Sequence, residues 1–192
     1  MKLKNYSYLF RIWHWANSLV VLGLMGTVFL RKGFLSYKTN AGVIQSRLAE
    51  NGTTIDIDLA KAIAKSIREP MWDWHYILGF SLIAMIVVRL VLHFSERPLF
   101  VASEWKQNQP HKKLAQLFYS LYYLVILFMG LSGLSLYFGQ DLGLSKDLQH
   151  IIKEIHETGM IFFIVFVPLH LIGLVVAENR DEKGVVSNMI GR

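Results

Sequence analysis

The chain has 192 residues, of which 53% are hydrophobic and 13% aromatic, while Asp, Glu, Lys and Arg together make up only 18%. Soluble domains carry about 25% charged residues, and the mean hydropathy here is +0.37. The formal net charge is +6, with the charges grouped between long uncharged stretches, which excludes an ordinary soluble domain. We expect no nucleic-acid partner. The absence of cysteine excludes disulfides, thiolate zinc sites, iron–sulfur clusters and thioether-attached haem.

Four stretches are long enough to cross a membrane, since a hydrocarbon layer about 30 Å thick needs roughly 20 apolar residues in a helix. They cover about residues 10–30, 73–94, 114–138 and 151–177. The stretches lack the charged faces, repeated at helical spacing, that helices in a soluble bundle carry. We therefore predict an all-α fold: an integral membrane four-helix bundle that forms a single membrane domain over residues 1–192.

The N-terminal stretch resembles a secretion signal only superficially. Its apolar run is too long, and Arg31 and Lys32 follow it without a small-residue cleavage site. We read it as a retained span. The distribution of Lys and Arg slightly favours the N-terminal tail, the second loop and the C-terminal tail as the cytoplasmic side, so both termini are expected in the cytoplasm.

The first loop, residues 31–71, is unusually long. Within it Leu59, Ile63 and Ile67 recur every fourth residue before Pro70, which predicts a short amphipathic helix in this extramembrane loop. Such a helix either lies flat on the lipid surface or faces a partner protein.

Four of the seven histidines fall inside the predicted spans, where ionisable groups are costly and are candidates for function. His14 begins the first span and His75 the second, while His156 lies near the start of the fourth span and His170 near its end. The step from His156 to His170 turns a helix by about 1400°, roughly 40° short of four turns, and advances about 21 Å. Both rings therefore project from nearly the same face, at two depths.

Antiparallel spans place these histidines at two shared levels. His75 and His156 both begin helices that run inward, so they share the outer level. His14 begins a helix that runs outward and His170 ends one that runs inward, so they share the inner level. Facing imidazoles in an apolar bundle are what two non-covalent, bis-histidine haem b groups require. We predict the axial pairs His75 with His156 and His14 with His170.

Alternatives to ligation remain at each position. A lone histidine at a span edge often forms its hydrogen bonds with water. Zinc would need further ligands, and no Asp or Glu is placed to supply them. We assign no catalytic residue.

Small residues one turn from the histidines would leave room for a flat ring. These are Ser18, Gly79, Gly159 and Gly173. The third span carries a similar group, which close helix packing explains equally well: Gly130, Ser132, Gly133 and Ser135.

Haem propionates are anionic and favour cations. Arg11, one turn before His14, is predicted to contact the inner haem, and Arg89 is predicted at the inner level on the bundle-facing side. Snorkelling of Arg89 to the inner surface is the alternative. His93 is kept as an alternative propionate or quinone contact. His111 and His150 are expected to be solvated.

With these features the chain resembles the bacterial cytochrome b561 family, which is similar to the membrane cytochrome b subunits of nickel–iron hydrogenases and respiratory formate dehydrogenases. The resemblance covers all four spans and is carried by these segments: Arg11-Ile12-Trp13-His14-Trp15, His75 with Gly79, Arg89-Leu90, Ile155-His156-Glu157 and Pro168-Leu169-His170.

The resemblance implies a di-haem b-type cytochrome, embedded in the lipid of the bacterial inner membrane. It would move electrons between a periplasmic dehydrogenase, hydrogenase or cytochrome partner and membrane quinone, with the quinone near His170. The long first loop departs from compact stand-alone members and favours an electron-transfer subunit. Two other functions stay open: a stand-alone oxidoreductase that passes electrons from superoxide or another small donor to quinone, and, more remotely, a haem-free membrane anchor.

Overall fold

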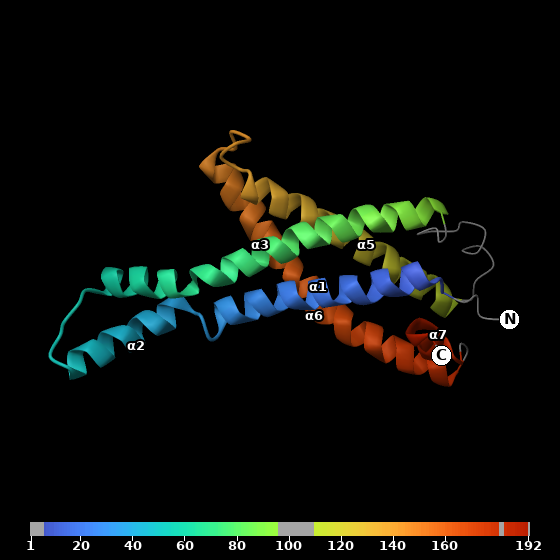
Figure 1. The fold of residues 1–192 in the computed structure, drawn as a ribbon, viewed down its shortest axis with the longest axis horizontal. Helices are drawn as coiled ribbons and strands as arrows, with labels where there is room; N and C mark the ends of the chain where they lie inside the picture. Colours follow the sequence, from blue (N-terminus) through green and yellow to red (C-terminus); the bar gives the residue numbers. More distant parts are fainter. Residues whose placement is uncertain (1–5, 96–109, 181–182, 192) are drawn as a thin grey trace. The chain divides into compact units, whose positions relative to one another are not determined.

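The structure is a computed structural model that describes residues 6–95, 110–180 and 183–191 (Figure 1). It is 86% helix, and no strand occurs in these ranges. The helices are α1 (Tyr8–Lys32), α2 (Tyr37–Glu50), α3 (Ile57–Ser95), α5 (Pro110–Tyr137), α6 (Lys146–Asn179) and α7 (Val185–Ile190). Four of them, α1, α3, α5 and α6, are long and apolar enough to cross a membrane. The predicted all-α class with four spanning helices is therefore confirmed.

The chain forms two compact units that share α1 and α3. The first unit contains residues 1–18 and 82–192, and the second contains residues 19–81. The first unit thus holds the start of α1, the second half of α3, and α5, α6 and α7. The second unit holds the rest of α1, α2 and the first half of α3.

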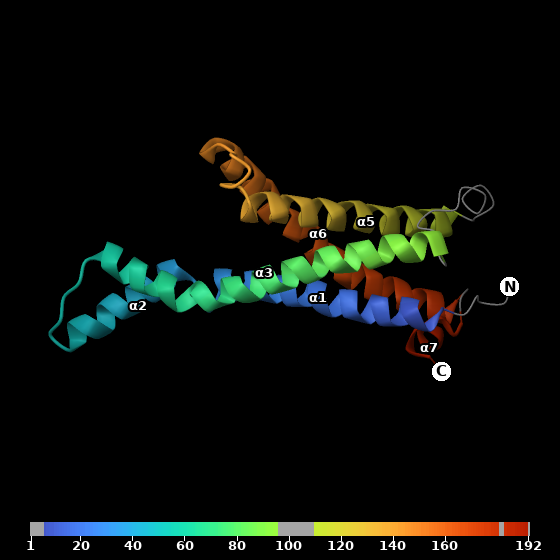
Figure 2. The ribbon, with the colours of Figure 1, turned by 45° about the horizontal axis from the view of Figure 1, so that its top comes forward.

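In the first unit α5 and α6 pack along each other (Figure 2). The contact is close at Gly159, where an added Cβ would collide with the Met129 sulfur. The end of the Ile83 side chain from α3 lies similarly close to Gly130 of α5, since an added Cβ at Gly130 would be 2.6 Å from it. These two glycines serve helix packing, the explanation that the sequence left open for Gly130.

The short helix α7 folds back beside α6 and packs against the start of α1. The Glu178 carboxylate accepts hydrogen bonds from the backbone N–H groups of Gly184 (2.8 Å) and Val186 (3.0 Å), which stabilises the first turn of α7. The backbone N–H of Tyr6 donates to Asn188 Oδ1 at 2.9 Å. This end of the first unit therefore fixes the segment of α1 that carries His14.

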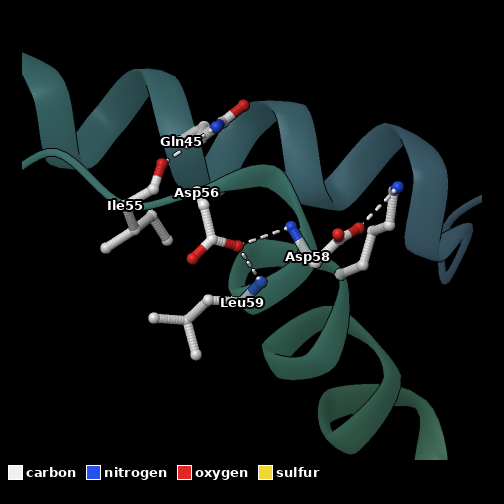
Figure 3. Close-up of polar contacts among 6 residues, drawn as sticks. Gln45, Ile55, Asp56, Asp58 and Leu59 are labelled. Atoms are coloured by element: carbon white, nitrogen blue, oxygen red, sulfur yellow. Dashed lines mark hydrogen bonds and ion pairs between the residues drawn. The ribbon is translucent and has the colours of Figure 1, made fainter.

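In the second unit α2 and the first half of α3 form a helical hairpin (Figure 1). Its contact is made by small side chains, since Ala41, Ala60 and Ala64 are no more than 1% exposed. The turn is held by Gln45 Nε2, which donates to the Ile55 carbonyl at 3.0 Å (Figure 3). Asp56 caps α3, because its Oδ1 accepts from the backbone N–H groups of residues 58 and 59 at 2.8 and 2.7 Å.

The hairpin corrects the predicted loop in one respect. The amphipathic helix of residues 58–69 is the first part of α3 and continues through Pro70 into the second span. A proline removes one backbone hydrogen bond, and the apolar span beyond it keeps the helix continuous. The apolar row that was expected to face lipid or a partner is not used to pack against α2: Leu59, Ile63 and Ile67 are 49%, 37% and 56% exposed, while Ala60 and Ala64 beside them are buried.

Replacing Gly159 by valine is expected to destabilise the first unit by about 1–3 kcal/mol, because the branched side chain would overlap the Met129 sulfur in a packed interface. The measurement is the midpoint of thermal unfolding in detergent, followed by circular dichroism. Gly42→Val in α2 is the matched control, since a Cβ at Gly42 meets nothing within 4 Å. Equal effects of both substitutions would contradict the packing role of Gly159.

Candidate functional site

Two of the predicted histidines face each other within the first unit. The rings of His14 in α1 and His170 in α6 have centroids 6.3 Å apart and planes inclined by 46°. Among the described residues, the buried Nδ1 of His14 has no hydrogen-bond partner. An iron bound to two imidazole nitrogens at about 2 Å each places the ring centroids roughly 6 Å apart. The observed separation therefore fits a metal held between the two rings.

Aromatic side chains enclose His170. The Phe166 ring, one turn earlier on α6, stacks on it with a centroid distance of 5.7 Å and an interplanar angle of 6°. Tyr119 of α5 meets it edge-on at 5.8 Å, and the Tyr119 hydroxyl lies 3.4 Å from His170 Nδ1. Tyr122 stacks on the other side of this cluster against Phe166 at 4.6 Å. The stacked Phe166 ring covers one face of the His170 ring.

His75 has a hydroxyl partner in the second unit. Its Nδ1 lies 2.8 Å from the Thr27 hydroxyl of α1. That hydroxyl donates its proton to the Leu24 carbonyl at 2.7 Å. Thr27 is only 5% exposed, so the contact is made away from solvent.

His156 has the equivalent partner in the first unit. Its Nδ1 lies 2.8 Å from the Ser132 hydroxyl of α5, which is 7% exposed. Ser132 donates its proton to the Phe128 carbonyl at 2.7 Å. The ring also packs against the α5 backbone, since a Cβ on Gly133 would lie 3.4 Å from His156 Cε1.

Arg89 lies inside the first unit and is 5% exposed. Its guanidinium carbon lies 5.0 Å from the ring centroid of Tyr123 and 5.6 Å from those of Phe10 and Trp13. Arg89 Nε also donates to the Tyr123 hydroxyl at 3.1 Å. The side chain is thus enclosed by aromatic rings from α1 and α5, which differs from the snorkelling alternative. Its predicted contact with a propionate stays a prediction.

Arg11 lies against the end of α7. A Cβ on Gly191 would collide with Arg11 Nη1, and Gly191 has φ of +93°, a conformation that favours glycine. A cation at this place complements the carbonyl end of a helix. The buried Nε of Arg11 has no hydrogen-bond partner among the described residues, and it stays available for the predicted propionate contact.

The small residues near the histidines fall into two groups. A Cβ on Gly79 or Gly173 would meet nothing within 4 Å, and the room that these glycines would leave for a ring stays a prediction. Gly159 packs against α5 instead. Ser18 donates to the His14 carbonyl at 2.7 Å.

The remaining histidines have separate surroundings. The side chain of His150 is 69% exposed and lies 3.7 Å from Glu154. His93 meets Phe94 edge-on with ring centroids 4.9 Å apart. The side chain of His111 lies outside the described residues.

Two features of the site are not predicted by the sequence patterns above. Both Thr27 and the role of Ser132 become predictable when the depths of polar residues in neighbouring spans are compared. Thr27, for example, lies about as close to the end of the first span as His75 lies to the start of the second. A second buried polar pair was also missed: Asn17 Nδ2 donates to the Tyr122 hydroxyl at 2.6 Å, while Asn17 Oδ1 is buried and has no partner among the described residues.

The donor set fits haem better than a protein-ligated metal ion. No group of three or more His, Cys, Asp or Glu side chains that could hold a metal ion is found in residues 6–95, 110–180 and 183–191. A porphyrin supplies four ligands itself, so that two facing imidazoles complete the iron. Long apolar helices with such a histidine pair define the class of membrane-bound b-type cytochromes.

Comparison with known families agrees with this class. The family profile described as prokaryotic cytochrome b561 matches residues 5–192. No curated protein and no solved structure matches the chain. The chain belongs to the prokaryotic cytochrome b561 family. It is accordingly a prokaryotic membrane protein of the b-type cytochrome kind, which binds haem and takes part in electron transfer.

Proposed function

We propose that this chain is a di-haem b-type cytochrome that transfers electrons between a periplasmic redox partner and the membrane quinone pool, as the membrane subunit of a respiratory oxidoreductase complex. It would lie in the inner membrane with both termini in the cytoplasm. The observation that carries the proposal is the facing pair of His14 and His170, with ring centroids 6.3 Å apart. The haem would supply one-electron chemistry at its iron.

The residues of the chain would hold and orient that group. His14 and His170 would ligate the haem of the inner level, and the aromatic rings around His170 would exclude water from it. His75 and His156 would ligate the haem of the outer level. They belong to different compact units, and their pairing stays a prediction from helix direction and depth.

Two arginines would balance the charge of the inner propionates. Arg89 carries its charge into the first unit within an aromatic enclosure, where the surroundings screen it less than water does. Arg11 lies one turn from His14, with a buried Nε that has no partner in the described part of the chain. Quinone would bind at the same level, near His170 and with His93 as an alternative contact.

The hairpin of α2 and α3 supports the subunit reading over the stand-alone oxidoreductase. It presents the exposed apolar row Leu59, Ile63 and Ile67. Lys65 and Arg68 on the same helix lie over the Tyr37 ring at 5.4 and 4.9 Å, which keeps these cations at the α2 contact. An exposed apolar row beside such a hairpin fits a protein partner, here a periplasmic dehydrogenase, hydrogenase or cytochrome.

The proposal is tested on the purified full chain by a reduced-minus-oxidised spectrum with haem quantitation. We expect two haem b groups per chain, and we expect a soluble quinone analogue to reoxidise the dithionite-reduced protein. A single haem, or none as in a membrane anchor, would contradict the proposal. Rapid quinone reduction by the isolated chain with superoxide as the sole donor would instead establish the stand-alone oxidoreductase.

A further inference from the structure

We propose that the hydroxyls of Thr27 and Ser132 are positioning groups for two haem-ligating histidines. Each accepts the Nδ1–H of its own histidine, His75 or His156, and thereby lowers the midpoint potential of the haem that this histidine ligates. The inference rests on the proposed function, because it takes His75 and His156 as the ligands.

The direction of both hydrogen bonds follows from the single proton of a hydroxyl group. Thr27 uses this proton on the Leu24 carbonyl at 2.7 Å, an oxygen that can only accept. Its own oxygen must then accept from the ring nitrogen of His75 at 2.8 Å. In this arrangement His75 carries its proton on Nδ1.

Ser132 repeats the arrangement on another helix. Its proton goes to the Phe128 carbonyl at 2.7 Å, so its oxygen accepts from His156 Nδ1 at 2.8 Å. Thr27 and Ser132 belong to different helices and serve different histidines. The same chemistry at two independent places indicates a common requirement rather than a local packing accident.

Burial makes each contact consequential. Thr27 and Ser132 are 5% and 7% exposed, so little water is available to replace either hydroxyl. A buried N–H that loses its acceptor is destabilised, because no water takes the place of the lost partner. Each hydroxyl therefore holds its imidazole in a defined orientation.

The fixed tautomer matters for ligation. An imidazole protonated at Nδ1 carries its lone pair on Nε2, the nitrogen offered to iron. An acceptor at Nδ1–H makes the ring a stronger electron donor, which stabilises the ferric state more than the ferrous state. The Thr27 and Ser132 hydroxyls should therefore lower the midpoint potential.

The other two histidines lack this support. In the described part of the chain His14 Nδ1 has no hydrogen-bond partner, and His170 Nδ1 has only the Tyr119 hydroxyl at 3.4 Å. Changes at Thr27 and Ser132 should therefore shift the potential of a haem ligated by His75 or His156, while a haem ligated by His14 and His170 serves as an internal reference.

The test compares Thr27→Val and Ser132→Ala with the wild-type chain by potentiometric titration and by electron paramagnetic resonance of the ferric haems. Each substitution removes the acceptor with little change in shape. We expect each to raise the midpoint potential of the haem that its histidine ligates, with a roughly tenfold change in the ferric-to-ferrous ratio of that haem, about 59 mV for a one-electron couple. Thr27→Ser retains the hydroxyl and should restore the wild-type potential and haem content.

Ser135→Ala is the matched control, because Ser135 donates to the Leu131 carbonyl at 2.9 Å in the same way and one turn away on α5. Unchanged potentials in Thr27→Val and Ser132→Ala, with both haems retained, would overturn the inference and leave the proposed function intact. A shift in the haem that His14→Ala removes, with the other potential unchanged, would also overturn the inference. A wild-type chain without two haems would overturn the proposed function itself.

Discussion

Alanine substitution of His14 and His170 together is expected to remove the same haem that either single substitution removes. The two rings face each other at 6.3 Å, so loss of one leaves the other without a counterpart across the iron. A non-covalent haem held by a single imidazole in an apolar site is released far more readily than one with two ligands. The double variant should therefore retain about as much haem as each single variant.

The crossed double variant gives the opposite result. His14→Ala combined with His156→Ala removes one ligand from each predicted pair, so we expect a chain that is nearly free of haem. His75→Ala combined with His156→Ala should again behave like either of its single variants. The readout is haem content per chain, measured as the pyridine haemochromogen after purification.

His150→Ala is the control for this series, since the His150 side chain is 69% exposed. It should retain the wild-type haem content. The pairing would be refuted if the double variant of His14 and His170 lost both haems, or if the crossed variant still retained one.

The histidine pattern could be predicted because helix geometry alone determines it. The spacing of His156 and His170 gives their common face, and antiparallel spans give their levels. The structure brings His14 and His170 together within one unit, as that reasoning requires. Their role as haem ligands stays a prediction.

Helix α2 was missed for a physical reason. Its contact face carries Tyr37, Ala41 and Ile44, and its partner face on α3 carries Ala60 and Ala64. Alanine packs closely but gives only a weak hydrophobic signal. The larger residues Leu59, Ile63 and Ile67 give a stronger hydrophobic signal, and they lie on the exposed face of α3.

Sequence periodicity does not reveal the contacts of a single polar atom, and so it does not predict the hydroxyl partners. In the sequence Ser132 is one small residue among several, and no pattern distinguishes Thr27. The contacts depend on the axial register of neighbouring helices, which apolar composition constrains only loosely. Comparing the depth of every polar residue in neighbouring spans would have identified both.

Replacing Arg89 by alanine is expected to destabilise the first unit by about 2–4 kcal/mol, through the loss of cation–π contacts and the cavity left among the rings. The guanidinium contacts Phe10, Trp13 and Tyr123 at 5.0 to 5.6 Å, and Trp13 itself links α1 to α3 through a 2.8 Å hydrogen bond to the Met85 carbonyl. Thermal unfolding in detergent measures the effect.

The same substitution should also change a potential, because a reduced haem carries one more electron and is stabilised by a nearby cation. We expect Arg89→Ala to lower the midpoint potential of the haem that His14→Ala removes. Arg89→Lys keeps the charge and should leave this midpoint potential close to its wild-type value. Arg47→Ala is the control, since the Arg47 side chain is 74% exposed and pairs with Glu50 at the surface. A loss of stability with both potentials unchanged would mean that Arg89 acts by joining α1, α3 and α5 and has no part in balancing the propionate charge.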